Sequence, residues 1–326
     1  MRLFSRRRRQ AGPEEMVLGH PYDDTVLDAA VETGSLVAAR TVLEECRDDH
    51  ETRALRTDVL GRAFIGRADE IAEAASATGD PELWLLAGSV YRHEAWTVRG
   101  DGVAEDVGHD RYQIFFATLR KAVAPLHEAA AQLPEDPCPW MVLVCVGQGL
   151  QVDREQQDEV WSETVLRSPT LYPAHWYRVQ ALAAKWGGSH EASLRFARET
   201  VARAPAGHPL TAVLPLAHFE VYLHNLEETF RARRRVEYFR IHTRYFEDNA
   251  GELVDASDKW SRDPVPHPRA REAHNLFAAA LSQAGDLPRT RRHLLGMEDR
   301  LHPVPWAYLG DPEQEYRRTA SRYLLT

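Results

Sequence analysis

Histidines and carboxylates are the side chains of this 326-residue chain that come closest to a catalytic or metal-binding pattern. The chain contains 15 histidines, and four of them directly precede a glutamate: His50, His93, His127 and His190. A zinc-binding helix of the His-Glu-x-x-His type needs a second histidine four residues after the first, because residues at that spacing share one helix face. That second histidine is missing in each case. We therefore expect no metal site and no other cofactor.

Motifs for nucleophilic catalysis and for phosphate binding are also missing from the sequence. The pair Gly100 and Gly102 lacks the third glycine of a dinucleotide-binding fingerprint, and it follows a predicted helix where that fingerprint requires a strand. We expect a protein without catalytic activity. One enzymatic alternative stays open, because catalytic groups are defined by their geometry and not by their order in the chain. It is a site formed by His93, Glu94 and His190.

The helices that would position such side chains are indicated by a spaced proline and tryptophan pattern. Pro-x-x-Trp occurs four times, and two of its tryptophans, Trp140 and Trp176, lie 36 residues apart. Each of these two is followed 29 residues later by a proline, Pro169 or Pro205. Proline is favoured in the first turn of a helix, and a tryptophan one turn later supplies a large apolar contact for a neighbouring helix. A period in the mid-thirties is typical of stacked two-helix repeats.

The turn inside the second of these repeats can be assigned residue by residue. We expect one helix to end near Lys185 and Trp186, the two glycines that follow to supply left-handed backbone, and a serine to cap the next helix. Capping alone explains this run, and it gives a structural role to Trp186, Gly187, Gly188 and Ser189.

The pattern resembles the tetratricopeptide-repeat class of helical solenoids. Ala192 and Phe196 stand where that class places its small and aromatic packing positions, and Pro205 lies near its closing proline. The match is best over residues 137–205. The resemblance implies an all-α protein, a solenoid of stacked antiparallel helix pairs.

Three short segments also resemble a bacterial family of uncharacterised proteins, a domain of unknown function. They are residues 185–191, 284–288 and 305–312, and the similarity covers about residues 80–320. This resemblance implies no activity.

In tetratricopeptide-like arrays the first helix of each pair lines a concave groove, and late residues of those helices contact the ligand. The resemblance therefore implies a groove that binds a peptide or protein of unknown identity, lined by Arg92, His93, Gln148, Lys185 and Glu220. In this groove Arg92 and Lys185 would clamp a carboxylate of the partner. We predict that the chain is a non-catalytic protein–protein interaction module.

Charge is unevenly distributed along the chain. The formal net charge is −9, yet the first nine residues carry five arginines and no acid. The acidic remainder of the chain should repel nucleic acid and anionic membranes unless a local basic patch outweighs its net negative charge. Nucleic acid is therefore not an expected partner. Residues 231–244 are basic with interleaved aromatic residues, and we expect an ordinary amphipathic helix there. The alternative function is a binder of nucleic acid or of an anionic surface, which uses the Arg-rich tail and this helix.

Shifts in composition divide the chain into four parts. We expect a disordered Arg-rich tail, a helical-repeat array with an acidic Gly-rich loop at 99–110, a Pro-containing connector, and a C-terminal helical pair with a cap. The four parts are residues 1–19, 20–247, 248–267 and 268–326.

The sequence also predicts a cytoplasmic location. The arginine block is not followed by the apolar run of a secretory signal, and no uncharged apolar stretch reaches the ~18 residues of a membrane-spanning helix. The three cysteines give no reason to expect a disulfide framework. The preference for arginine over lysine, together with abundant alanine, is typical of a GC-rich bacterial genome.

Overall fold

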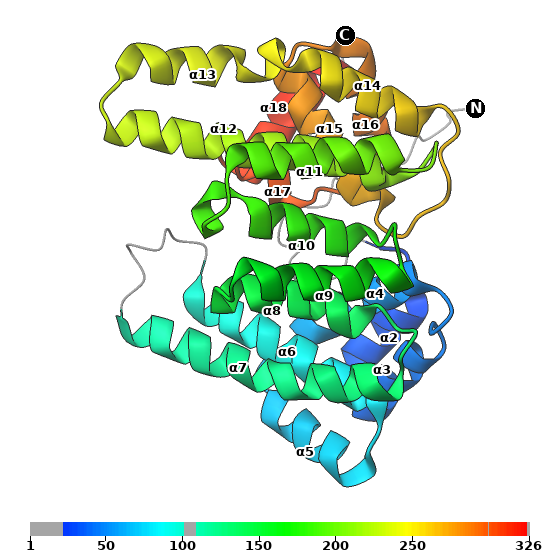
Figure 1. The fold of residues 1–326 in the computed structure, drawn as a ribbon. Coiled ribbons are helices and arrows are strands. Elements are labelled where there is room, and N and C mark those ends of the chain that lie inside the picture. Colours follow the sequence, from blue (N-terminus) through cyan, green and yellow to red (C-terminus); the bar gives the residue numbers. More distant parts are fainter. Residues whose placement is uncertain (1–21, 101–108, 299, 325–326) are drawn as a thin grey trace, which may run out of the picture. The chain divides into compact units, whose positions relative to one another are not determined.

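The computed structural model describes residues 22–100, 109–298 and 300–324. Within these ranges the regular elements are helices and none is a strand, which confirms the predicted all-α class (Figure 1). The tail predicted at 1–19, and most of the Gly-rich loop predicted at 99–110, lie outside the described residues.

Contacts between residues divide the described chain into two compact units. One unit is formed by residues 24–197, and the other by residues 22–23 together with residues 198–324. The division falls inside a helix, α11 (His190–Arg203). Each unit has its own core, as expected for a chain of this length.

Helices joined by short turns build the unit of residues 24–197. Helix α6 is its central element, because it packs against α4, α5, α7 and α8 and most of its residues are buried. Preceding α11, the helices are α2 (Thr25–Thr33), α3 (Leu36–Glu44), α4 (His50–Ala63), α5 (Ala68–Thr78), α6 (Pro81–Arg99), α7 (His109–Gln132), α8 (Cys138–Leu150), α9 (Arg154–Arg167), α10 (Tyr172–Leu182) and the short 3-10 helix η2 (Ala184–Trp186).

The prolines of the Pro-x-x-Trp pattern stand in the first turns of helices, as predicted. Pro81 begins α6 directly after Asp80, whose side chain accepts a hydrogen bond from the backbone N–H of Glu82 at 2.9 Å. Pro173 lies in the first turn of α10. Pro137 is the exception: it is the N-cap of α8, and the neighbouring Pro139 lies in the first turn of that helix. A proline is tolerated there because the first N–H groups of a helix have no intrahelical acceptor.

The turn predicted at residues 185–189 is present, although the preceding α-helix ends earlier than expected. Helix α10 ends at Leu182, the chain tightens into η2, and Gly187 then takes a left-handed φ of 80°. The Oγ of Ser189 accepts a hydrogen bond from the N–H of Ala192 at 3.1 Å and so caps α11. A Cβ atom at Gly188 would lie 2.0 Å from the carbonyl oxygen of Leu182, so only glycine fits at this position.

Trp186 joins this turn to α6. Its ring packs edge-on against Trp96, with ring centroids 5.4 Å apart. The guanidinium of Arg99 lies over both indole rings, 5.4 Å from the centroid of Trp96 and 5.0 Å from that of Trp186. These contacts support the structural role predicted for Trp186, because cation–π and edge-on ring contacts both favour this packing.

A buried ion cluster also holds the unit of residues 24–197 together. The Nη2 atom of Arg53 lies 2.7 Å from a carboxylate oxygen of Glu82 and 2.7 Å from one of Asp136. The three residues come from α4, α6 and the turn before α8, and all three are buried. A buried charge is tolerated only when it is paired, so this cluster fixes the positions of these helices.

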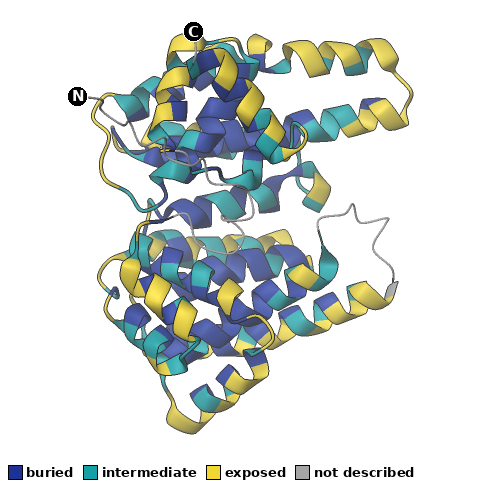
Figure 2. Ribbon diagram, turned by 180° about the vertical axis from the view of Figure 1, so that it is seen from behind, coloured by how far each residue is buried: buried dark blue, intermediate teal, exposed yellow. Residues whose placement is uncertain are grey.

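The other unit is arranged around α15 (Ala270–Gln283). Helix α15 packs against each of the other α-helices that lie wholly inside this unit, and its residues from Leu276 to Ser282 are all buried (Figure 2). These other elements are η3 (Pro209–Ala212), α12 (Val213–Arg231), α13 (Arg235–Asp248), α14 (Ala250–Ser261), α16 (Leu287–Gly296), α17 (Pro303–Trp306) and α18 (Pro312–Leu324).

Most of the segment predicted as a connector at 248–267 is helical in the structure, because α14 occupies residues 250–261. The local cause is an apolar face: Leu253, Ala256 and Trp260 recur at helical spacing and are buried. The prolines that suggested a connector follow only after α14 has ended.

Candidate functional site

Arg92 lies late in α6, where a groove residue was expected, but its side chain is buried and has partners inside its own unit. It forms an ion pair with Asp58 of α4, and its guanidinium lies 5.5 Å from the ring centroid of Tyr177. The hydroxyl of Tyr177 donates to the same carboxylate at 2.9 Å. The side chain predicted to clamp a carboxylate of a partner therefore holds a carboxylate of this chain.

Three other predicted groove residues are buried as well. His93 and Gln148 lie inside the unit of residues 24–197, and burial together with the charge of Arg92 lowers the pKa of His93. Glu220 is buried in the other unit, where the hydroxyl of Tyr308 donates to it at 3.1 Å. Lys185 is exposed. The peptide-binding groove stays a prediction, and the burial of these residues gives it no support.

The residues of the enzymatic alternative include one that caps a helix. An oxygen of Glu94 accepts hydrogen bonds from the backbone N–H groups of Gly66 at 2.7 Å and of Ala68 at 3.2 Å, so it caps the start of α5. His93 is buried, and His190 is the first residue of α11. The capping role of Glu94 was not evident from the sequence, because its partners lie more than twenty residues away.

A serine and two histidines form a hydrogen-bonded chain in the core around α15. The Oγ of Ser257 lies 2.7 Å from Nε2 of His293, and Nδ1 of His293 lies 2.9 Å from Nδ1 of His274. A serine on a histidine is the arrangement of an activated nucleophile. Ser257 and His293 are completely buried, however, and the ring of His293 stacks on Trp260. The hydroxyl is thus not accessible to a substrate, and the chain of hydrogen bonds serves the core.

A second buried histidine anchors the hairpin formed by α12 and α13. Nδ1 of His218 lies 3.0 Å from the hydroxyl of Tyr245, and Nε2 lies 3.0 Å from a carboxylate oxygen of Glu252. Arg198 donates to the other oxygen of Glu252 at 2.7 Å. Hydrogen bonds from Arg198 and His218 lower the pKa of Glu252 to about 2, so the carboxylate stays charged. These contacts hold the base of α13 against α12 and α14.

The α12–α13 hairpin extends beyond the rest of its unit (Figure 1). Its turn is a Schellman motif, in which the N–H of Arg234 donates to the carbonyl of Thr229 at 2.9 Å and the N–H of Arg233 donates to that of Phe230 at 3.0 Å. Arg233 takes the left-handed φ of 54° that this motif requires. Glycine is usual at that position, because a Cβ atom makes the conformation less stable.

One face of α13 packs on α12, as expected for an amphipathic helix. Nδ1 of His242 lies 3.0 Å from the hydroxyl of Tyr222, and Phe246 packs on Phe219 with ring centroids 4.7 Å apart. The helix begins at Arg235 and not at residue 231, because the chain reverses direction at Arg233.

The tip of the hairpin is largely exposed (Figure 2), and three of its exposed side chains are apolar. Phe230 at the end of α12 is 73% exposed, and Val236 and Phe239 on α13 are 87% and 66% exposed. Single exposed apolar residues are ordinary on a protein surface, but three within ten residues form an apolar patch. We call Phe230, Val236 and Phe239 the apolar tip.

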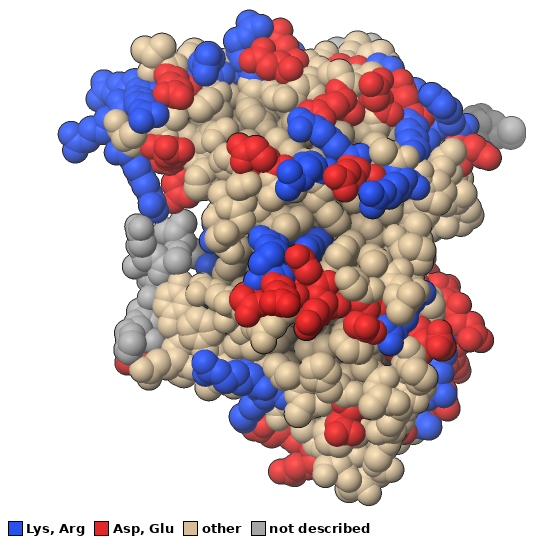
Figure 3. All heavy atoms as spheres, viewed as in Figure 1, with Lys and Arg blue, Asp and Glu red and all other residues tan. Residues whose placement is uncertain are grey.

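Arginines gather at the same end of the hairpin (Figure 3). Arg231 is paired with Glu227 at 2.8 Å, and Arg234 lies 3.6 Å from Glu237. Three more are exposed and have no carboxylate partner among the residues that the structure describes. We call these three the free arginines: Arg233, Arg235 and Arg240.

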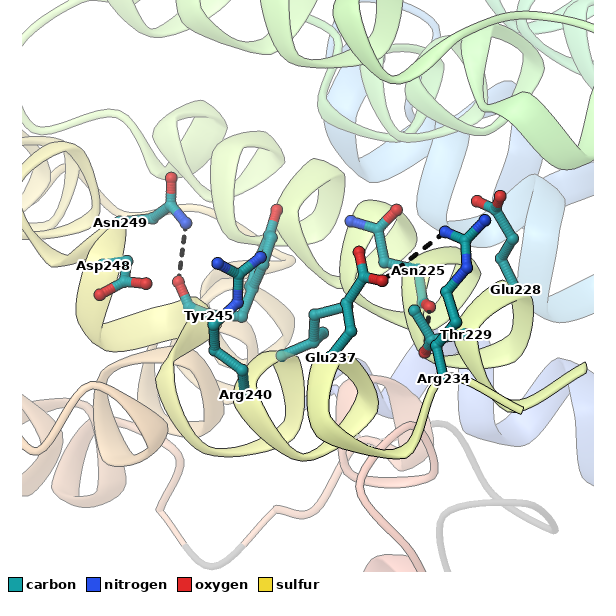
Figure 4. Close-up of a pocket in the computed structure, with 10 residues that line it drawn as sticks. Asn225, Glu228, Thr229, Arg234, Glu237, Arg240, Tyr245, Asp248 and Asn249 are labelled. Carbon is teal, nitrogen blue, oxygen red and sulfur yellow. Dashed lines mark hydrogen bonds and ion pairs between the residues drawn. The ribbon is translucent and has the colours of Figure 1, made fainter. Parts of the chain in front are cut away.

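A cleft of about 310 Å³ lies between α12 and α13 (Figure 4). Its charged groups are of both signs, because Arg234 and Arg240 face it together with Glu228, Glu237 and Asp248. A balanced lining selects neither anions nor cations. The cleft therefore indicates no ligand class, whereas the free arginines at the tip of the hairpin select for anions.

Comparison of the chain with families of known proteins, with curated proteins and with solved structures found no match. Among the described residues, no helix combines the length and the apolar character that crossing a bilayer requires.

Proposed function

We propose that the chain is a non-catalytic binding protein and that the α12–α13 hairpin is its contact element for a polyanionic surface. The observation that carries this proposal is the hairpin tip, where the free arginines stand exposed beside the apolar tip. A guanidinium without an internal partner keeps its N–H donors for phosphate or carboxylate oxygens of a ligand. An arginine that is already paired, such as Arg92, lacks this capacity.

The acidic character of the whole chain makes the hairpin the preferred point of contact. The formal net charge of the protein is −9, so a polyanion is repelled by the mean field and attracted by the basic tip. At physiological ionic strength electrostatic fields decay over about 8 Å. The charges of the hairpin tip therefore outweigh the net charge of the chain for a polyanion that is close to the tip. Binding should therefore occur through the hairpin and should weaken steeply as salt is added.

Retention on immobilised heparin, a generic polyanion, tests the proposal. We expect the wild type to be retained and a triple glutamine variant of the free arginines to elute at clearly lower salt. A matched control removes the same charge from exposed arginines of α4, α11 and α16 and should elute close to the wild type: Arg62→Gln, Arg195→Gln and Arg291→Gln.

The N-terminal arginines also contribute to retention on heparin, so the comparison is repeated with the tail neutralised. In this second series the five arginines among the first nine residues are replaced by glutamine in every protein. Equal elution of the hairpin variant and the control in both series would refute the proposed function.

A further inference from the structure

We infer that the polyanionic surface bound by the hairpin is that of an anionic phospholipid bilayer. In this interaction the apolar tip enters the headgroup region, and the free arginines contact lipid phosphates. The inference rests on the proposed function and names the partner of the same site.

The apolar tip is the part of the hairpin that charge attraction alone does not explain. Elsewhere in the described chain, the large exposed apolar residues lie far apart in the sequence, and Leu287 and Leu295 are the one pair that shares a helix: Val26, Val37, Ile65, Ile114, Leu166, Val265, Leu287 and Leu295. Phe230, Val236 and Phe239 are gathered at one end of one hairpin. Apolar side chains in water are unfavourable, and the interface of a bilayer removes them from water without requiring a shaped pocket.

The three side chains of the apolar tip all lie close to the turn of the hairpin. Val236 and Phe239 are three residues apart on α13, and so lie on one helix face. Phe230 lies across the turn, with its ring centroid 6.2 Å from that of Tyr238. All three belong to the end of the hairpin that extends beyond its unit (Figure 1).

The free arginines lie where they can reach the phosphates of the same bilayer. Arg233 is in the turn, and Arg235 and Arg240 are on α13 beside Val236 and Phe239. Arginine has a long apolar stem, so it packs along buried apolar groups while its guanidinium stays at the polar boundary. Basic residues interleaved with aromatic and aliphatic ones are the pattern of helices that lie in the interface of anionic membranes.

Two features of the tip favour a bilayer over single-stranded nucleic acid. Nucleic acid is bound by aromatic rings that stack on successive bases along a basic groove. Val236 is the most exposed of the three apolar side chains and has no ring to stack. The two aromatic rings of the tip also belong to different helices, Phe230 to α12 and Phe239 to α13, and so do not follow one another along one groove.

The conformation of Arg233 adds an independent argument that charge is needed at the tip. Its left-handed φ would be relieved by glycine, yet a side chain with a positive charge occupies the position. Local strain that is kept in a structure often marks a functional site.

Sedimentation with lipid vesicles tests the inference. The wild type should bind vesicles made of equal parts phosphatidylglycerol and phosphatidylcholine and should not bind phosphatidylcholine alone. Serine replacement of the whole apolar tip should weaken vesicle binding by roughly tenfold or more, while heparin retention stays as in the wild type. The matched control removes three exposed apolar residues elsewhere and should bind vesicles like the wild type: Val37→Ser, Leu166→Ser and Leu295→Ser.

Quenching of tryptophan fluorescence tests whether the apolar tip enters the lipid. In Phe239→Trp, addition of anionic vesicles that contain brominated acyl chains should quench indole emission more strongly than in the wild type. Equal quenching in the two proteins would contradict insertion of the apolar tip. Circular dichroism melts of every variant establish that loss of binding is not loss of folding.

The outcomes separate the inference from the proposed function. If heparin retention depends on the free arginines but the protein does not bind anionic vesicles, the bilayer is excluded as the partner, and the proposed polyanion-binding function is still supported. If the serine variant binds vesicles like the wild type, the bilayer is likewise excluded as the partner. It is also excluded if the wild type binds a single-stranded oligonucleotide and the serine variant does not. Heparin retention that does not depend on the free arginines refutes both.

Discussion

The side chains of Arg92 and Asp58 form an ion pair between α6 and α4, and Tyr177 of α10 donates a hydrogen bond to the same carboxylate. The pair is largely shielded from solvent. Removal of the arginine deprives this shielded carboxylate of the positive charge of Arg92, so we expect Arg92→Ala to lower the free energy of unfolding by about 3–5 kcal/mol. Urea denaturation measures this loss. An Arg92→Ala protein as stable as the wild type would contradict the internal role of the pair.

The exposed Lys185 supplies the matched control for this measurement. We expect Lys185→Ala to change the free energy of unfolding by less than about 1 kcal/mol, because even a paired charge contributes little when it is exposed to solvent. The same variant is the cleaner probe of the predicted peptide groove. Substitution of Arg92 would mix a folding defect with any loss of partner binding.

Arg233→Gly should make the protein more stable while it weakens binding to polyanions. Glycine adopts the left-handed φ of 54° without the crowding of a Cβ atom, which is a gain of about 1 kcal/mol. Thermal unfolding followed by circular dichroism measures the gain, and heparin elution measures the loss. A variant that is more stable and binds less cannot owe its weaker binding to unfolding. Unchanged or lower stability would show that the turn tolerates arginine without strain.

Gly188→Ala should destabilise the turn between η2 and α11. The added Cβ atom would lie 2.0 Å from the carbonyl oxygen of Leu182, and because that oxygen belongs to the backbone it has little freedom to move. We expect a loss of about 1–3 kcal/mol, the usual range for overpacking. Gly251→Ala in α14 is the control, because open space surrounds that position and alanine favours a helix by about 1 kcal/mol. Chemical denaturation of both variants should therefore give changes of opposite sign.

Protonation of His274 should destabilise the unit around α15, whereas protonation of the buried Glu272 acts in the opposite direction, because burial raises the pKa of Glu272 to about 8. Burial lowers the pKa of His274 from 6.5 to about 4, so between these values the unfolded chain binds a proton that the folded chain does not. The stabilisation is complete above pH 6.5, declines as the pH falls through this window and is lost at about pH 4, with a total near 3 kcal/mol. Urea denaturation at a series of pH values measures this slope.

His274→Gln provides the comparison for the pH series. The variant should lose part of the slope between pH 6.5 and pH 4, whatever its stability at neutral pH. Part of the slope should persist, because burial also lowers the pKa values of His93 and His293. A slope as steep as that of the wild type would mean that His274 does not titrate as described.

Several local features could be predicted from the sequence because their causes are local. Pro81, Pro139 and Pro173 mark first turns, since proline lacks an N–H group that those turns do not use. Gly187 and Ser189 mark a turn and a cap for the same kind of reason. The segment predicted as a connector at 248–267 is helical over most of its length, because Leu253, Ala256 and Trp260 form a buried apolar face of α14 before the prolines begin.

The candidate site was only partly predictable. The basic and aromatic composition of residues 231–244 was evident, and so was the amphipathic helix. The turn at Arg233 was not, because the left-handed position of a Schellman motif is usually filled by glycine and here holds arginine.

The sequence by itself determined the all-α class, the helix starts at proline and the presence of a basic, aromatic segment, because these depend on neighbours within one or two turns. The tertiary structure alone decided which charged and apolar side chains are covered. Whether Arg92 and Glu220 are exposed depends on which elements pack on their helices. Both side chains are buried in the structure. Val236 and Phe239 are apolar like residues of a core, yet they lie at the tip of the hairpin and are exposed there.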